Sequence, residues 1–173
     1  MPNLFFSEGS TDSFPDMDEE VYDLYFSNHV INRVPNKLQA FENAFRCLKN
    51  GGRFAIHLGV SMTAVKKLAV DVFQPELYKK LVSEMYFYEN QSTLMDYCKK
   101  AGFKVVHSYE STVTWSYQSK KDFLKWFCFV THGLFDLRNV TEERMKSFNP
   151  PQDEAGQIVM EYPEGTIIAV KDV

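Results

Sequence analysis

Two histidines stand where the sequence predicts the ends of two short strands. Residues 21–27 read VYDLYFS and residues 53–58 read RFAIHL, and both segments are rich in aliphatic and aromatic residues, which favours buried strands. Asn28 and His29 end the first strand, and His57 lies near the end of the second. An imidazole ordinarily titrates near neutral pH, so His29 is a candidate general base. Ordinary surface histidines beside strand ends are the alternative interpretation.

A helix must connect these two strands. In the segment 35–50, apolar residues recur at three- and four-residue spacing and form one stripe, which predicts an amphipathic helix. Gly51-Gly52 follows and is expected to stop it. Strand, helix and strand within about 40 residues predict a βαβ unit, whose parallel strands both end at the edge where ligands of α/β sheets bind.

The rest of the chain continues to alternate between extended and helical patterns. We expect strands at 3–7, 103–117, 158–162 and 166–170, and a loop at 10–20. We expect helices at 63–88 with a break near Pro75, at 92–101 with Ser92 or Thr93 as cap and Gly102 as stop, at 119–134 with Ser119 as cap, and at 141–148. A Pro-rich loop covers 149–156, and a turn at 163–165 separates the last two strands. This pattern predicts a three-layer α/β fold.

Composition excludes several classes of protein. The 173 residues fit one domain, and the formal net charge of -4 argues against a general nucleic-acid binder. Cys47, Cys98 and Cys128 form no CxxC pair, so we expect reduced thiols and neither a disulfide framework nor a metal site. No signal peptide and no stretch of roughly 20 apolar residues is present, which predicts a cytoplasmic protein that does not bind membranes.

The segment 22–56 carries a family resemblance. Tyr22-Asp23-Leu24, Ser27-Asn28, Val34-Pro35 and the run 46–53 (RCLKNGGR) stand in the order and spacing of the second half of a class I S-adenosylmethionine-dependent methyltransferase. Asn50 replaces the usual Pro of the family's K-P-G-G turn. The segments FFSEGS at 5–10, AGF at 101–103 and IIAVK at 167–171 resemble the third, sixth and final strands. A softer resemblance, carried by the helix 119–126, is to the trans-aconitate and juvenile hormone acid methyltransferase branch.

The resemblance implies a fold and site residues. The fold is a partial Rossmann-like sheet, from the third to the seventh strand, with helices on both faces, an antiparallel last strand and a helical cap inserted at 117–157. S-adenosylmethionine is the implied cofactor, and its contacts would come from the following residues: Ser10, Thr11, Asp12, Asn28 and His29. Ser10 departs from the family's Asp, and Asp12 is a possible substitute. A plain capped turn is the alternative for this segment.

A small-molecule methyl acceptor would lie near the same edge. His29 would act as its base, while Arg33, His57 and Trp126 are candidates to bind the substrate. An exposed Arg33 and an aromatic core residue at Trp126 are the alternative interpretations. Most of the aromatic residues at 115–129 should be plain core.

The resemblance does not include the family's first two strands. No GxGxG turn occurs in the sequence, so the chain is expected to be an N-terminally truncated single domain that is inactive by itself. In the family the fourth strand lies against the first, so the strand at 22–28 would be left as an apolar edge. We therefore expect self-association, or a second chain that supplies strands. A non-catalytic remnant that binds another chain through this edge, and a module for an unrelated ligand, remain alternatives.

Overall fold

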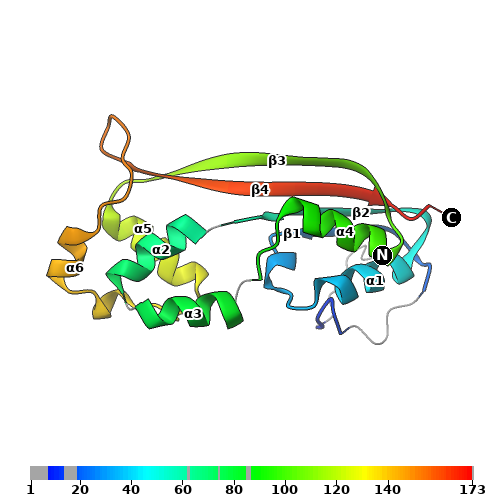
Figure 1. The fold of residues 1–173 in the computed structure, drawn as a ribbon, viewed down its shortest axis with the longest axis horizontal. Helices are drawn as coiled ribbons and strands as arrows, with labels where there is room; N and C mark the ends of the chain where they lie inside the picture. The colour runs from blue at the N-terminus through cyan, green and yellow to red at the C-terminus, as the bar shows by residue number, and fades with distance from the viewer. Residues whose placement is uncertain (1–7, 14–18, 62, 74, 85–86, 173) are drawn as a thin grey trace, which may run out of the picture. The chain divides into compact units, whose positions relative to one another are not determined.

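The protein contains four strands and six α-helices in the part of the chain that its computed structural model describes, which is residues 8–13, 19–61, 63–73, 75–84 and 87–172 (Figure 1). The order is β1 (Tyr22–Asn28), α1 (Lys37–Cys47), β2 (Leu48–Gly59), α2 (Thr63–Val72), α3 (Pro75–Glu84), α4 (Gln91–Ala101), β3 (Lys104–Tyr117), α5 (Lys120–Val130), α6 (Glu142–Ser147) and β4 (Ile158–Val170). Two 3-10 turns, Ile31–Arg33 and Leu137–Asn139, follow β1 and α5. The strand predicted at 3–7 lies outside the described residues. None of the described helices is both long and apolar enough to cross a bilayer.

The four strands form one sheet in the order β1-β2-β4-β3. β1 pairs with β2 in parallel, with Tyr25 opposite Phe54 and Asn28 opposite His57. The predicted βαβ unit and the α/β class are therefore confirmed. Among the residues that the structure describes, β1 and β3 are the edges of this sheet, and β4 lies between β2 and β3.

The chain divides into two compact units, which we describe separately. The first unit comprises residues 1–58, 89–109 and 165–173, and it holds β1, α1 and α4. The second unit comprises residues 59–88 and 110–164, and it holds α2, α3, α5 and α6. β2, β3 and β4 contribute residues to both units. The single domain with a cap at 117–157 stays a prediction.

Phe54 of β2 is the centre of the core of the first unit. Its fully buried ring lies 4.8 Å from the ring of Phe41 on α1, 4.8 Å from Phe103 and 5.2 Å from Tyr25 on β1. α1 and α4 pack against each other on this face of the sheet (Figure 1). Phe41 and Ala44 of α1 have no exposed surface, and Phe41 contacts Phe54 of β2. The predicted apolar stripe of the 35–50 helix is therefore buried against β2.

The second unit has its own aromatic core. Its buried side chains come from α2, α3, α5, β4 and the segments beside them, and the largest fully buried ones are Phe73, Phe123, Phe127 and Phe135. Tyr117 and Tyr162 hydrogen-bond through their hydroxyl groups at 2.8 Å. The pKa values of both hydroxyls are raised, mainly by burial. Phe123 and Phe127 are plain core, as the sequence predicts, whereas Phe129 is 81% exposed.

Two predicted helix boundaries are wrong. α1 ends at Cys47, and Gly51-Gly52 lies inside β2 instead of stopping the helix. The glycines pair with the chain after β4: Gly51 N–H donates to Lys171 O, and Lys171 N–H donates to Gly52 O. α4 is capped by Asn90, whose side chain accepts from Thr93 N–H at 2.9 Å, and not by Ser92 or Thr93.

Two predictions about strands also need correction. The turn predicted at 163–165 does not form, because β4 runs unbroken from Ile158 to Val170 and the Pro163 carbonyl accepts from Val60 N–H. β1 is not the buried strand that its composition suggested. Leu24 and Phe26 are 56% and 67% exposed, because β1 is an edge strand and these side chains lie on the face opposite Tyr25.

Other predicted boundaries are confirmed. The helical segment 63–88 breaks before Pro75, as the missing N–H of proline requires. Ser119 caps α5 by accepting from Asp122 N–H at 3.1 Å. Gly102 ends α4 in the left-handed region, with φ 103.

Gly102 should tolerate alanine poorly. A Cβ at this position would lie 2.9 Å from Phe45 Cζ, and the Phe45 ring is held against Phe103 at 5.1 Å. We expect Gly102→Ala to lower the free energy of unfolding by about 2–3 kcal/mol, because left-handed strain adds to the steric clash. Gly51→Ala is the control, since Gly51 has φ 78 and nothing within 4 Å of the added atom; we expect a loss of about 1–2 kcal/mol. Urea unfolding measures the free energy of unfolding of both variants. Equal losses for Gly102→Ala and Gly51→Ala would contradict a clash with Phe45.

Lys37, the first residue of α1, is a buried cation. It is 3% exposed, and its Nζ donates to Val34 O at 3.0 Å. Burial lowers the pKa of Lys37 to about 8, and the charge of Glu89 opposes the fall. In the unfolded chain the amine keeps its ordinary pKa of 10.5. The unfolded state therefore binds more protons between pH 8 and 10.5, so this group makes stability rise with pH in that window.

We expect Lys37→Met to remove that rise. The free energy of unfolding of the variant relative to wild type should fall as pH increases from 8 to 10, by at most about 1.4 kcal/mol per pH unit. Urea unfolding at pH 8 and at pH 10 measures the difference in unfolding free energy between the variant and wild type. Groups that titrate in both proteins cancel in this difference. Lys79→Met on α3 is the control, because Lys79 is exposed. A difference that is constant with pH for Lys37→Met would show that burial does not lower the pKa of this amine.

Candidate functional site

His29 and His57 come together at the carboxyl ends of β1 and β2. The parallel register places Asn28 opposite His57, and His29 is the next residue. The two imidazole rings contact edge to face, with 5.2 Å between centroids and 86° between planes. His29 N–H donates to His57 O at 2.7 Å, which extends the pairing of the two strands by one residue. Both histidines therefore lie at the carboxyl ends of their strands, where the sequence placed them, and the structure adds their contact.

His29 has a backbone conformation that most side chains avoid. Its φ is 55, in the left-handed region. The cost for a residue with a Cβ is about 1–2 kcal/mol, although histidine is found there more often than branched residues. The backbone hydrogen bond to His57 holds this turn in place. Non-glycine residues in this region cluster at functional sites.

Thr166 on β4 orients the ring of His57. Its Oγ1 lies 2.8 Å from His57 Nδ1. The strand around Thr166 is fixed by buried Gln91, whose Nε2 donates to Thr166 O at 3.0 Å and to Ser108 Oγ at 2.7 Å. His57 thus has a set ring orientation and is half-buried.

Two further predicted residues lie close in sequence to the pair. Asn28 is exposed at the end of β1. Arg33 is half-buried in the turn Ile31–Arg33 that follows. Both stand on the carboxyl side of the strand, where the sequence placed them, and their roles stay predictions.

Ser10, Thr11 and Asp12 form a turn. Ser10 Oγ donates to Asp12 Oδ1 at 2.5 Å, and Asn43 Nδ2 on α1 donates to Thr11 O at 2.9 Å. Burial raises the pKa of Tyr25 on β1 to about 12. The turn is therefore attached to α1, and Asp12 is half-buried.

Trp126 lies in the aromatic cluster of the second unit. Its ring is 5.6 Å from Tyr117, 5.7 Å from Trp115 and 5.5 Å from Tyr162. It is half-buried on α5, so packing accounts for much of its environment. Its role in binding a substrate stays a prediction.

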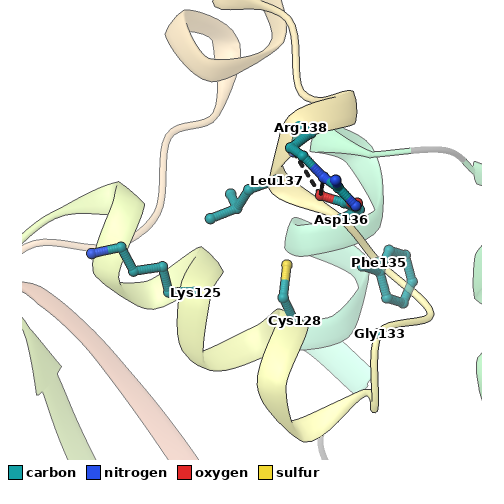
Figure 2. Close-up of a pocket in the computed structure, with 7 residues that line it drawn as sticks. All are labelled: Lys125, Cys128, Gly133, Phe135, Asp136, Leu137 and Arg138. Atoms are coloured by element: carbon teal, nitrogen blue, oxygen red, sulfur yellow. Dashed lines mark hydrogen bonds and ion pairs between the residues drawn. The ribbon is translucent and has the colours of Figure 1, made fainter.

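The second unit also has an open pocket of about 400 Å³ beside α5 (Figure 2). Cys128, Phe135 and Leu137 give it an apolar wall. Arg138, at its rim, donates from Nε to Asp136 Oδ2 at 2.8 Å. Burial raises the pKa of the Cys128 thiol, which therefore stays protonated and weakly nucleophilic at neutral pH. All three cysteines are free thiols, as predicted.

Thr166 was not among the predicted site residues. Thr166 is 109 residues from His57 in sequence, and no local pattern joins the two.

Comparison with known proteins connects this geometry to a family. The model of a family described as methyltransferase domain matches residues 1–127. No curated protein matches the chain by sequence.

Three solved structures resemble the fold. A protein from Bacillus halodurans, described as a candidate methyltransferase, has 17% identity and a TM-score of 0.62, with 97% of this chain and 78% of that chain covered. The YcgJ protein from Bacillus subtilis has 14% identity and a TM-score of 0.62, with 99% and 73% covered. A chain in the complex between the Haloferax volcanii Trm112 methyltransferase activator and a candidate methyltransferase has 12% identity and a TM-score of 0.52, with 95% and 60% covered. These similarities concern the fold.

The family match spans most of the chain, including the whole β1–α1–β2 unit that carries both histidines. The chain therefore belongs to the methyltransferase domain family.

Proposed function

We propose that the chain takes part in S-adenosylmethionine-dependent methyl transfer to a small molecule, with His29 as general base. The observation that carries this proposal is the contact of His29 with His57 at the carboxyl ends of two adjacent parallel strands, in a member of the methyltransferase family. Ligands of α/β sheets bind at this edge.

The residues of this chain would prepare the acceptor. S-adenosylmethionine, when bound, supplies an activated methyl group on a sulfonium. His29 would take the proton of an acceptor hydroxyl or amine as the new bond to the methyl carbon forms, and the electron pair of the broken S–C bond would remain on sulfur. His57, Asn28 and Arg33 would orient the acceptor, because methyl transfer depends mainly on alignment. A carboxylate acceptor would need no base.

The residues of this chain could contact the adenine end of the cofactor but not its methionine end. The Asp12 carboxylate accepts from Ser10 and has further lone pairs for an adenine amino group. Asn28 offers an exposed amide at the strand end. No glycine-rich turn of the family type occurs among the 173 residues, so we assign the methionine end of the cofactor to no residue here.

S-adenosylhomocysteine binding tests this function. We expect calorimetric titration of the chain to show binding, and Asp12→Ala to weaken it at least about tenfold through loss of a hydrogen bond to a charged group. Asp96→Ala is the control, since Asp96 is exposed on α4 and pairs with Lys99. Absence of binding at about 1 mM ligand, or equal effects of the two variants, would contradict the assignment.

The exposed surface of β1 supports a second candidate, which is association through the sheet edge. Tyr22, Leu24 and Phe26 alternate on one face of this edge strand and are 48%, 56% and 67% exposed. Asp23, the only charged residue of β1, alternates onto the opposite face and pairs with Lys49 at 2.9 Å. An edge strand with an uncharged apolar face is suited to pair with another strand.

We propose a second copy of this chain as the occupant. If two β1 strands pair in antiparallel orientation about Leu24, Tyr22 faces Phe26 of the other copy. Asp23 then faces Tyr25, so no like charges are opposed. The Haloferax volcanii structure, in which a similar fold occurs in a complex with an activator protein, is consistent with a partner chain.

Sedimentation velocity tests the association. We expect a dimer, and we expect Leu24→Lys to raise its dissociation constant at least about a hundredfold, because the two introduced cations would face each other. Val106→Lys is the control: Val106 is 55% exposed on β3, the other edge of the sheet. A monomer at all concentrations, or dissociation by Val106→Lys alone, would exclude pairing through β1.

A further inference from the structure

The imidazoles of His29 and His57 are close enough to share one ligand. A ring nitrogen of each lies within 4.8 Å of the other. Two imidazole nitrogens that bind one tetrahedral metal at 2.0–2.1 Å lie about 3.4 Å apart. A side-chain rotation of the exposed His29 that moves its ring nitrogen by at most about 1.4 Å closes the difference. The hydrogen bond from His29 N–H to His57 O keeps the two backbones, and therefore the two rings, close together during such a rotation.

Thr166 provides the support that a metal-binding histidine usually has. Histidines that bind metals generally donate their other ring N–H to an oxygen, which fixes the tautomer and the orientation of the ring. His57 Nδ1 lies 2.8 Å from Thr166 Oγ1. When Nδ1–H donates to this oxygen, Nε2 carries the lone pair that a cation requires. Gln91 holds the Thr166 carbonyl, so the supporting residue is itself fixed.

We propose that His29 and His57 bind one divalent transition-metal cation of the Zn²⁺ type. Neutral imidazole is a preferred ligand of Zn²⁺, Cu²⁺ and Ni²⁺, and it is a poor ligand of Mg²⁺ and Ca²⁺. The positive φ of His29 aims its side chain from the strand end toward His57, which a regular β conformation would not do. Water completes the coordination. This site is an addition to the proposed function. A metal bound to His29 would occupy the lone pair that a general base needs, so His29 cannot have both roles at the same time.

Calorimetric titration of the chain with Zn²⁺ alone tests the site. A rise of the melting temperature on addition of Zn²⁺ is a second readout. We expect one Zn²⁺ per chain. His29→Asn should abolish binding without unfolding the protein, since asparagine tolerates the left-handed conformation. Thr166→Val should weaken binding about tenfold, whereas Thr166→Ser should restore it. Nitrogen NMR of His57 should show Zn²⁺ binding at Nε2 with Nδ1 protonated.

His107→Ala is the matched control, because His107 is an exposed histidine on β3 of the same unit. We expect its affinity for Zn²⁺ to stay within about twofold of wild type. The proposal is overturned if Zn²⁺ does not bind at about 1 mM, or if His29→Asn binds as tightly as wild type. The titration contains no S-adenosylhomocysteine, so failure of the site and failure of the proposed function are separate results.

Discussion

Parallel pairing of β1 with β2 is the constraint on which the candidate site depends. Parallel strands need a crossover, and α1 supplies it while burying Phe41 against Phe54. Because both strands then run in the same direction, the residues at their carboxyl ends meet at one edge. His29 and His57 are neighbours for this reason, although 28 positions separate them in sequence. A change that shifted the register by one residue would turn His57 to the other face of the sheet.

The same pairing leaves β1 as an edge with one apolar face exposed. Tyr25 is held by stacking on Phe54, whereas Leu24 and Phe26 on the other face remain exposed. Burying side chains of this size is worth about 1.5–3 kcal/mol each. Covering both in an interface therefore offers a substantial driving force for association. This energy would be gained next to the strand end that carries His29, so a partner at β1 would also border the candidate site.

The sequence predicted the elements whose signals are local. The stripe of α1, the break before Pro75, the Ser119 cap and the Gly102 stop depend on residues within a few positions of one another, and the structure has all four. The prediction that Gly51-Gly52 ends the helix was wrong, because glycine is common both at helix ends and in irregular strands. Here the backbone pairing of both glycines with the distant Lys171 places them in a strand. The turn expected at 163–165 failed for a similar reason, since sheet pairing overrides the local preference of Pro-Glu-Gly.

The candidate site shows the same division between local and distant signals. Strand ends can be predicted from sequence, so His29 and His57 could be placed at one edge of the sheet. Thr166 reaches His57 only through the order of the sheet, in which β4 lies beside β2, and no pattern near Thr166 indicates this. The oxygen contributed by β4 nevertheless determines what the pair can do. With Thr166 as acceptor, His57 presents a lone pair at Nε2, which suits a cation; with Thr166 as donor, His57 presents an N–H, which suits an anionic or carbonyl acceptor molecule beside the His29 base. One hydroxyl on β4 therefore connects the two proposed uses of the site and makes them mutually exclusive.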